Sequence, residues 1–131
     1  MSLFIDHVVI TVTDIDKSIH FYSNVLGMEL QEFLSTTDNA KRKSLKFGIQ
    51  KINLHEASKP FKPHAYNPLP GTMDICFLSE INVNDWIKIF DKFDIKIEDG
   101  PCTKTGANGQ IKSIYVRDPD KNLIEISNQN Y

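Results

Sequence analysis

Four side chains that can bind a divalent metal ion lie in segments whose pattern is typical of β-strands. They are His7, Glu56, Asp74 and Glu125, and each is flanked by apolar residues. An unpaired charge in such a setting is costly, and three carboxylates beside one imidazole would repel one another until at least one took up a proton. A divalent cation removes that conflict, so these residue types predict a metal site wherever the fold brings them together.

An internal repeat predicts that the fold brings these four side chains together. Residues 7–15 parallel residues 74–81, and residues 53–56 parallel residues 122–125, at offsets of 67 and 69 residues. Two half-domains of this size cannot each close a hydrophobic core, so we expect them to pair about a pseudo-two-fold axis. The alignment then makes Glu56 the counterpart of Glu125, and places equivalent positions near one axis.

The elements that must position these residues follow the same order in both halves. Alternating apolar residues predict strands at 4–12, 28–35, 44–48 and 51–57 in the first half, and at 72–79, 95–98, 110–116 and 122–127 in the second. Helical spacing predicts a helix from the N-cap Asp14 to Gly27 and another at 82–93. Residues 36–43 are a predicted turn, and 101–109 a predicted loop. The expected fold class is α+β, with two tandem βαβββ modules.

The module boundaries follow from the prolines. Residues 58–71 contain four prolines, a density that cannot continue a helix or a central strand. We therefore expect one domain over residues 1–131, with module one at about 3–57, a linker at 58–71 and module two at about 72–128.

Composition excludes several other classes of protein. The chain has 131 residues, 40% hydrophobic and 24% charged, which is ordinary globular composition. A net charge of -2 gives no positive electrostatic potential that would attract a nucleic acid. No apolar run approaches the ~20 residues of a membrane span. Two cysteines are too few for a disulfide scaffold, and the N-terminus does not read as a signal peptide. These features predict a soluble, cytoplasmic protein.

Three motifs resemble a known family. They are Ile5-Asp6-His7-Val-Val-Ile-Thr-Val, the helix ending Phe21-Tyr-Ser-Asn-Val-Leu-Gly27, and Arg117-Asp-Pro-Asp-Lys-Asn-Leu-Ile-Glu125-Ile. Together they resemble the vicinal oxygen chelate superfamily of glyoxalases, bleomycin-resistance proteins and extradiol dioxygenases, over nearly the whole chain. The resemblance implies paired βαβββ modules whose strands form a curled mixed sheet around a cavity holding a divalent metal.

The resemblance assigns the metal ligands one at a time. His7 matches the first-strand histidine, Glu125 the last-strand glutamate, and Glu56 the fourth-strand carboxylate of the glyoxalase branch. Neighbouring His55 competes with Glu56, because strand alternation points the two side chains to opposite faces and a register slip would exchange them. Asp74 stands where the family usually has histidine, and this oxygen-rich set favours a hard ion such as Mn or Mg over Ni, Co or Zn.

The leading functional hypothesis is a metal-dependent lyase or isomerase of glyoxalase type, acting on a small substrate with two neighbouring oxygens. The resemblance implies that a metal-bound glutamate, Glu125 or Glu56, is the base.

Other residues are candidates for contact with the ligand. Tyr115, Arg117 and Lys104 are candidate substrate-binding residues, and Phe47 and Phe77 are candidates to line an apolar cavity.

Two further hypotheses remain open. One is a metal-free, resistance-type protein that binds a drug or metabolite, which the Asp74 departure favours. The other is a ring-cleaving dioxygenase, which needs iron and a second histidine near His7, supplied by His55 only if its strand is rotated. On resemblance alone, we expect a homodimer.

Overall fold

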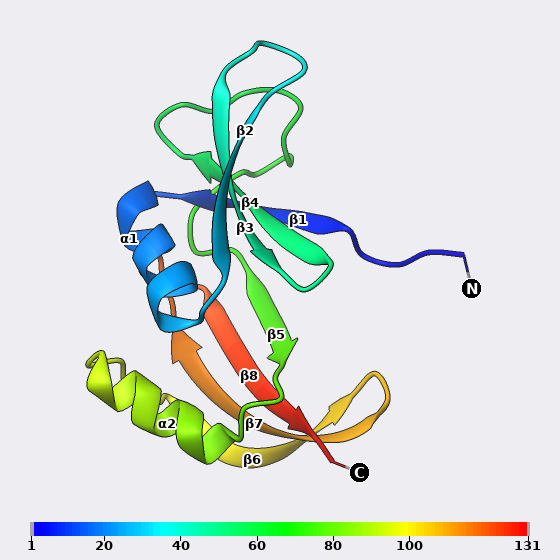
Figure 1. The fold of residues 1–131 in the computed structure, drawn as a ribbon, viewed down its shortest axis with the longest axis vertical. Coiled ribbons are helices and arrows are strands. Elements are labelled where there is room, and N and C mark those ends of the chain that lie inside the picture. The colour runs from blue at the N-terminus through cyan, green and yellow to red at the C-terminus, as the bar shows by residue number, and fades with distance from the viewer. Residues whose placement is uncertain (1, 131) are drawn as a thin grey trace. The chain divides into compact units, whose positions relative to one another are not determined.

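The computed structural model describes residues 2–130 and has an α+β fold made of two compact units, which divide between Gly71 and Thr72. Each unit contains a four-stranded mixed sheet and one helical segment (Figure 1). In both units the order along the chain is strand, helix and three strands, which confirms the predicted βαβββ order.

The first unit is built on β1 (His7–Val12), β2 (Glu29–Leu34), β3 (Lys41–Phe47) and β4 (Gln50–Glu56). The strands lie in the order β1-β4-β3-β2; β1 runs parallel to β4 and the other pairs are antiparallel. The helical segment is α1 (Ile15–Ile19), continued by a π-helical stretch, η1 (His20–Val25). Its buried side chains are Ser18, Phe21, Tyr22 and Val25.

Two predicted features of this first helix are confirmed. Asp14 Oδ1 accepts hydrogen bonds from the backbone N–H groups of Asp16 and Lys17, both at 3.1 Å, as an N-cap does. The helix ends before Gly27, whose φ of +84° is a conformation that glycine adopts without a Cβ penalty. The i→i+5 bond from Leu26 N to Phe21 O marks the π-helical turn.

The second unit repeats the plan with β5 (Asp74–Leu78), α2 (Val83–Lys92), β6 (Asp99–Gly106), β7 (Gly109–Arg117) and β8 (Leu123–Gln129). The strand order is β5-β8-β7-β6, with β5 parallel to β8. Helix α2 packs on β7 and β8 through its buried face, which includes Trp86 and Phe90. Asn82 caps this helix by accepting a hydrogen bond from Asn84 N at 2.8 Å.

Two sequence-based assignments in this unit were wrong. Residues 95–98 are not a strand, and most of the predicted loop 101–109 belongs to β6 and its hairpin with β7. Gly100 and Pro101 occupy a bulge at the sheet edge, where the pairing shifts between Asp99 and Cys102. An edge strand tolerates Pro101, which lacks an N–H group. Gly100 is required there because a Cβ would come within 2.4 Å of Ser113 O.

The first unit also differs in one boundary. β3 begins at Lys41, inside the predicted turn, while the proline-rich segment 58–71 contains neither helix nor strand, as predicted.

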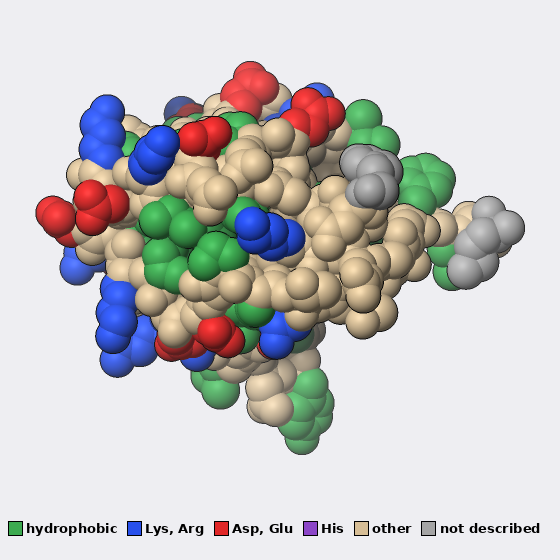
Figure 2. Space-filling model, turned by 90° about the horizontal axis from the view of Figure 1, so that it is seen from below, with side chains coloured by type: hydrophobic (Ala, Val, Ile, Leu, Met, Phe, Trp, Pro, Cys, Tyr) green, Lys and Arg blue, Asp and Glu red, His purple; other side chains and the backbone are tan. Residues whose placement is uncertain are grey.

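The surface seen in Figure 2 mixes charges of both signs. Lys, Arg, Asp and Glu side chains are interspersed around an area of hydrophobic side chains, so this face carries no extended field of one sign. None of the helices formed by residues 2–130 has the length and apolarity of a transmembrane span.

Candidate functional site

A pocket of about 410 Å³ lies within the second unit, on the face of its sheet that carries Glu125. Cys76 of β5, Tyr115 of β7 and Glu125 of β8 lie on this face, because Glu125 is paired across the sheet with both Cys76 and Tyr115. Eleven residues line the pocket: Cys76, Leu78, Lys104, Thr105, Gly106, Ala107, Asn108, Ile111, Tyr115, Glu125 and Gln129. Glu125, predicted to be a metal ligand and the base, therefore lies in the wall of a pocket large enough for a small molecule.

Two buried serines hold the Glu125 carboxylate in place. Ser113 Oγ donates to Glu125 Oε2 at 2.6 Å, and Ser127 Oγ donates to the same oxygen at 3.3 Å. The two hydroxyls are also 2.7 Å apart, and both serines are fully buried. Hydrogen bonds of this kind fix the orientation of the carboxylate.

Two weak acids beside Glu125 are kept protonated. Burial, followed by the charge of Glu125 and a hydrogen bond with it, raises the pKa of Tyr115 to about 12. Burial is also the main cause that raises the pKa of the Cys76 thiol, with a smaller contribution from Glu125, while a hydrogen bond with Ser127 opposes the rise. At neutral pH both groups therefore present hydrogens rather than negative charges to the pocket, and Cys76 lacks the thiolate that a nucleophile requires.

The raised pKa of Tyr115 predicts a loss of stability in alkali. An unfolded tyrosine ionises near pH 10, so the stabilisation by neutral Tyr115 is full below about pH 10 and is lost as the pH rises through its folded-state value of about 12. In the Tyr115→Phe variant, the urea concentration at the unfolding midpoint should fall less steeply between about pH 10 and about pH 12 than in the native chain. Urea unfolding followed at several pH values measures it, and parallel curves for the variant and the native chain would contradict the assignment.

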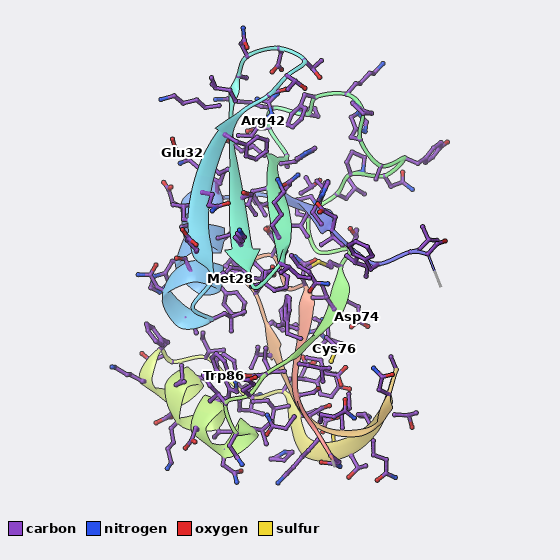
Figure 3. The ribbon with its side chains drawn as sticks, turned by 45° about the vertical axis from the view of Figure 1, so that its right-hand side comes forward. Met28, Glu32, Arg42, Asp74, Cys76 and Trp86 are labelled. Carbon is purple, nitrogen blue, oxygen red and sulfur yellow. The ribbon has the colours of Figure 1, made fainter. Side chains whose placement is uncertain are left out.

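Asp74 lies on the same face of the sheet as Glu125. Asp74 pairs with Leu123 and Cys76 with Glu125, so the two carboxylates are diagonal neighbours on parallel strands. Figure 3 shows Asp74 and Cys76 following one another along β5. Asp74 is exposed and Glu125 half-buried. The second unit thus supplies two oxygen donors on a single face.

In the first unit the structure does not bring His7 and Glu56 together. His7 pairs with Lys51 and Glu56 pairs with Val12, which separates them by five positions, roughly 17 Å, along the strands. Glu56 also shares its face with Ile52 and Leu54, whose side chains are buried in the core. This register does not support Glu56 as a partner of His7.

Asn53 occupies the position that sequence reasoning had given to Glu56. Asn53 pairs with Val9, two residues after His7, just as Glu125 pairs with Cys76, two residues after Asp74. Its Oδ1 atom is buried and has no hydrogen-bond partner among the described residues. Sequence similarity aligned Glu56 with Glu125. The positions that pair across the strands instead align Asn53 with Glu125.

His7 keeps one ring nitrogen for a further partner. Its Nδ1 atom lies 2.7 Å from Asp6 Oδ2, an arrangement that orients the ring as the outer partners of metal-binding histidines do. Within each unit, over residues 2–130, no three His, Cys, Asp or Glu side chains gather to hold a metal. Each unit by itself offers two side chains of types that bind divalent ions, at equivalent register positions: His7 and Asn53 in the first, and Asp74 and Glu125 in the second.

The competing ligand His55 has a different environment. It pairs with Thr11, four positions along the strands from His7, and its ring centroid lies 4.1 Å from that of Phe61. Burial, and then the charges of Arg42 and His64, lower the pKa of His55 below its usual 6.5. Its imidazole is therefore neutral at physiological pH.

This environment predicts an acid-side loss of stability. Because the folded-state pKa of His55 is lowered, its neutral form contributes stability that is present above about pH 6.5 and lost as the pH falls through the folded-state value. Phe61→Ala should expose the ring and raise its pKa towards the ordinary value, whereas Tyr66→Ala, at an exposed aromatic of the same segment, should not. An NMR pH titration measures the pKa, and a native His55 titrating above 6.5 would contradict the account.

The remaining candidate ligand-binding residues lie on different faces of their sheets. Lys104 lines the unit-two pocket, with its Nζ atom 5.6 Å from the centroid of Tyr115. Arg117 shares the face of Tyr115, but its guanidinium donates to both carboxylate oxygens of Glu98 and to Lys121 O. Phe77 pairs with Ile126 on the opposite face from Cys76, and Phe47 shares the face of buried Leu45. Neither phenylalanine is among the residues that line the pocket around Glu125.

Comparison with known proteins identifies the family. Residues 4–126 match the Glyoxalase/Bleomycin resistance protein/Dioxygenase superfamily. The chain is 49% identical over 123 residues to virulence protein STM3117 of Salmonella typhimurium, covering 94% of this chain and 82% of that protein. It is 48% identical to the glyoxalase domain-containing protein RDO1 of Mycosarcoma maydis, covering 94% of this chain and 66% of the relative.

A solved structure agrees with this relationship. The integron cassette protein VCH_CASS1 from the mobile metagenome of V. cholerae superposes with a TM-score of 0.91 at 41% identity, covering 99% of this chain and 98% of that one. The βαβββ order of both units and the matched residues lead to one conclusion: this chain belongs to the Glyoxalase/Bleomycin resistance protein/Dioxygenase superfamily.

Proposed function

We propose that the chain is a metal-dependent lyase or isomerase of glyoxalase type, acting on a small substrate with two neighbouring oxygens, with Glu125 as its base. The observation that carries the proposal is the setting of Glu125. Its carboxylate is fixed by Ser113 and Ser127 in the wall of a 410 Å³ pocket, with Asp74 on the same face. A curled sheet around one shared cavity remains a prediction from the family.

Four side chains would hold the ion: His7, Asn53, Asp74 and Glu125. The strand pairing favours Asn53 over Glu56, because Asn53 stands in the position equivalent to Glu125 and carries an unpaired buried oxygen. One imidazole and three oxygen donors suit Mn or Mg better than Zn, Ni or Co. When bound, a divalent ion supplies a Lewis acid that stabilises the oxyanion of the substrate.

The chain's own residues would move and direct the proton. Glu125, oriented by hydrogen bonds from two buried hydroxyls, would accept the proton from the substrate carbon next to the chelating oxygens. Tyr115, protonated at neutral pH, would donate a hydrogen bond from the same wall. Lys104, which lies near the Tyr115 ring, would favour an electron-rich substrate group.

A second candidate function is binding without chemistry, as in resistance-type members of the family. The pocket wall favours it through Leu78, Ile111 and the ring of Tyr115, which can contact an apolar ligand. The ring-cleaving alternative finds less support, because His55 is paired four positions away from His7 along the strands.

Metal loading tests the proposal. The purified protein is incubated in turn with Mn, Mg, Co, Ni, Zn and Fe(II), dialysed and subjected to elemental analysis. Retention of a single Mn or Mg ion per chain is the expected result. Retention of none of the six ions would remove the enzyme proposal and favour binding, and selective retention of iron would favour the dioxygenase. Light scattering on the same samples tests the expected homodimer.

A further inference from the structure

A second, smaller pocket of about 100 Å³ lies within the first unit. It opens on the sheet face that carries Asn53 and His55, and the rings of Phe33 and Phe61 form two of its walls. Arg42 of β3, labelled in Figure 3, also lines it, and no Asp or Glu is among the described residues of its lining. Its volume suits a group of a few non-hydrogen atoms rather than a whole ligand.

The Arg42 side chain is held firmly in this pocket. Its Nη2 atom lies 2.7 Å from Asp38 Oδ2, and its Cζ atom lies 3.6 Å from the centroid of the Phe61 ring. Only 14% of the side chain is exposed. A guanidinium fixed by an ion pair and an aromatic ring presents its remaining N–H groups in a defined direction.

One of those N–H groups has no acceptor. Arg42 Nε is buried and makes no hydrogen bond within the part of the chain that the structure describes. A buried donor of a charged group is costly to leave unpaired, and Asp38 occupies only the other end of the guanidinium. Asn53 Oδ1, in the same pocket lining, is also unpaired. It is a hydrogen-bond acceptor, so it cannot bond to an acceptor oxygen of a ligand.

We propose that this pocket binds the carboxylate of a small molecule, with one carboxylate oxygen accepting the hydrogen of Arg42 Nε. The inference rests on the first unit alone and adds a carboxylate-binding site to the proposed function. The two flat aromatic walls suit a planar group, and the small volume with a single half-paired arginine does not suit a doubly charged phosphate.

The test follows the Arg42 side chain directly. Acetate and its neutral counterpart acetamide are titrated into the metal-free, full-length protein, so that no ion can capture the carboxylate. NMR monitors the Arg42 Nε–H signal. Acetate is expected to shift this signal saturably and acetamide is not. Arg42→Gln and Arg42→Lys should each weaken acetate binding by at least about 10-fold, since a charge-assisted hydrogen bond is lost.

Lys17→Gln is the matched control, because it removes one positive charge from an exposed position in the same unit. It should leave acetate binding unchanged, and amide spectra establish that each variant is folded. If the two Arg42 variants bind acetate as the native chain does, or if Lys17→Gln weakens binding equally, the inference is overturned.

The outcomes also separate this inference from the proposed function. If the native chain retains no divalent ion but acetate still shifts Arg42 Nε–H, the lyase proposal fails and a metal-free carboxylate site stands. If the chain retains an ion but acetate leaves Arg42 unchanged, the carboxylate inference fails and the metal proposal stands.

Discussion

Replacing His7 or Glu125 with alanine is expected to weaken Mn²⁺ binding by more than about 100-fold. Loss of a hydrogen-bonding partner behind a metal ligand alone costs 10- to 100-fold in affinity, and loss of a ligand costs more. Both residues have an outer partner that orients them, Asp6 for His7 and Ser113 for Glu125. Titration of free Mn²⁺ by electron paramagnetic resonance measures the affinity for each variant.

Glu56→Ala and Asn53→Ala decide between two alignments of the repeat. Glu56 lies on the core-facing side of its sheet, so Glu56→Ala should leave Mn²⁺ affinity unchanged. Asn53→Ala should weaken it by about 10-fold, because it removes a neutral oxygen donor. The reverse pattern, with Glu56→Ala as damaging as Glu125→Ala and Asn53→Ala silent, would restore the pairing inferred from sequence similarity.

The order of elements could be predicted from the sequence because periodicity and caps are local. The Asp14 cap, the Gly27 helix end and the proline-rich linker all have their cause within a few residues. Pairing between strands has no such local cause. The repeat of similar residues aligned Glu56 with Glu125, whereas the register of β1 with β4 puts Asn53 at the position equivalent to Glu125.

The supports of Glu125 show a second limit. Serine is common in strands and loops, and nothing in the types of Ser113 and Ser127 marks them as partners of a carboxylate. They meet because β7 and β8 pair so that Ser113 faces Ser127, one position along the same sheet face from Glu125. Likewise, residues 101–109 were predicted to be a loop because the strand that most of them form, β6, lies at the edge of the sheet, which is a property of the assembled sheet.

The Asp118–Asn122 connection between β7 and β8 yields the prediction with the largest expected effect on stability. Asp118 Oδ1 accepts from Asn122 N, and Asp118 Oδ2 accepts from Asn122 Nδ2, both at 2.8 Å. Asn122 Oδ1 in turn accepts from Met73 N at 2.8 Å. Asn122 and Asp118 are 1% and 4% exposed, so water cannot replace these bonds.

Asn122→Ala is therefore expected to lower the free energy of unfolding by about 2–4 kcal/mol, because it removes the hydrogen bond to Asp118 Oδ2 and leaves the part-buried Met73 N–H without its acceptor. Asn84→Ala, at an exposed position of α2, should change it by less than about 0.5 kcal/mol. Trp86, the single tryptophan, lies in the same unit, so urea unfolding followed by its fluorescence reports this transition. Equal effects of the two substitutions would contradict a structural role for the motif.

The same substitution should reach the proposed metal ligands. Met73 is the residue before β5, and Asn122 the residue before β8, so their bond fixes where the pairing of Asp74 with Leu123 begins. Without this hydrogen bond, β5 can shift along β8, and the carboxylates of Asp74 and Glu125 then lose their fixed relative position along the strands. We expect Asn122→Ala to weaken Mn²⁺ binding and Asn84→Ala to leave it unchanged. Both affinities are measured without urea, where the fluorescence of Trp86 shows that each variant is folded. Unchanged affinity in a folded Asn122→Ala variant would separate the stability of this connection from the geometry of the site.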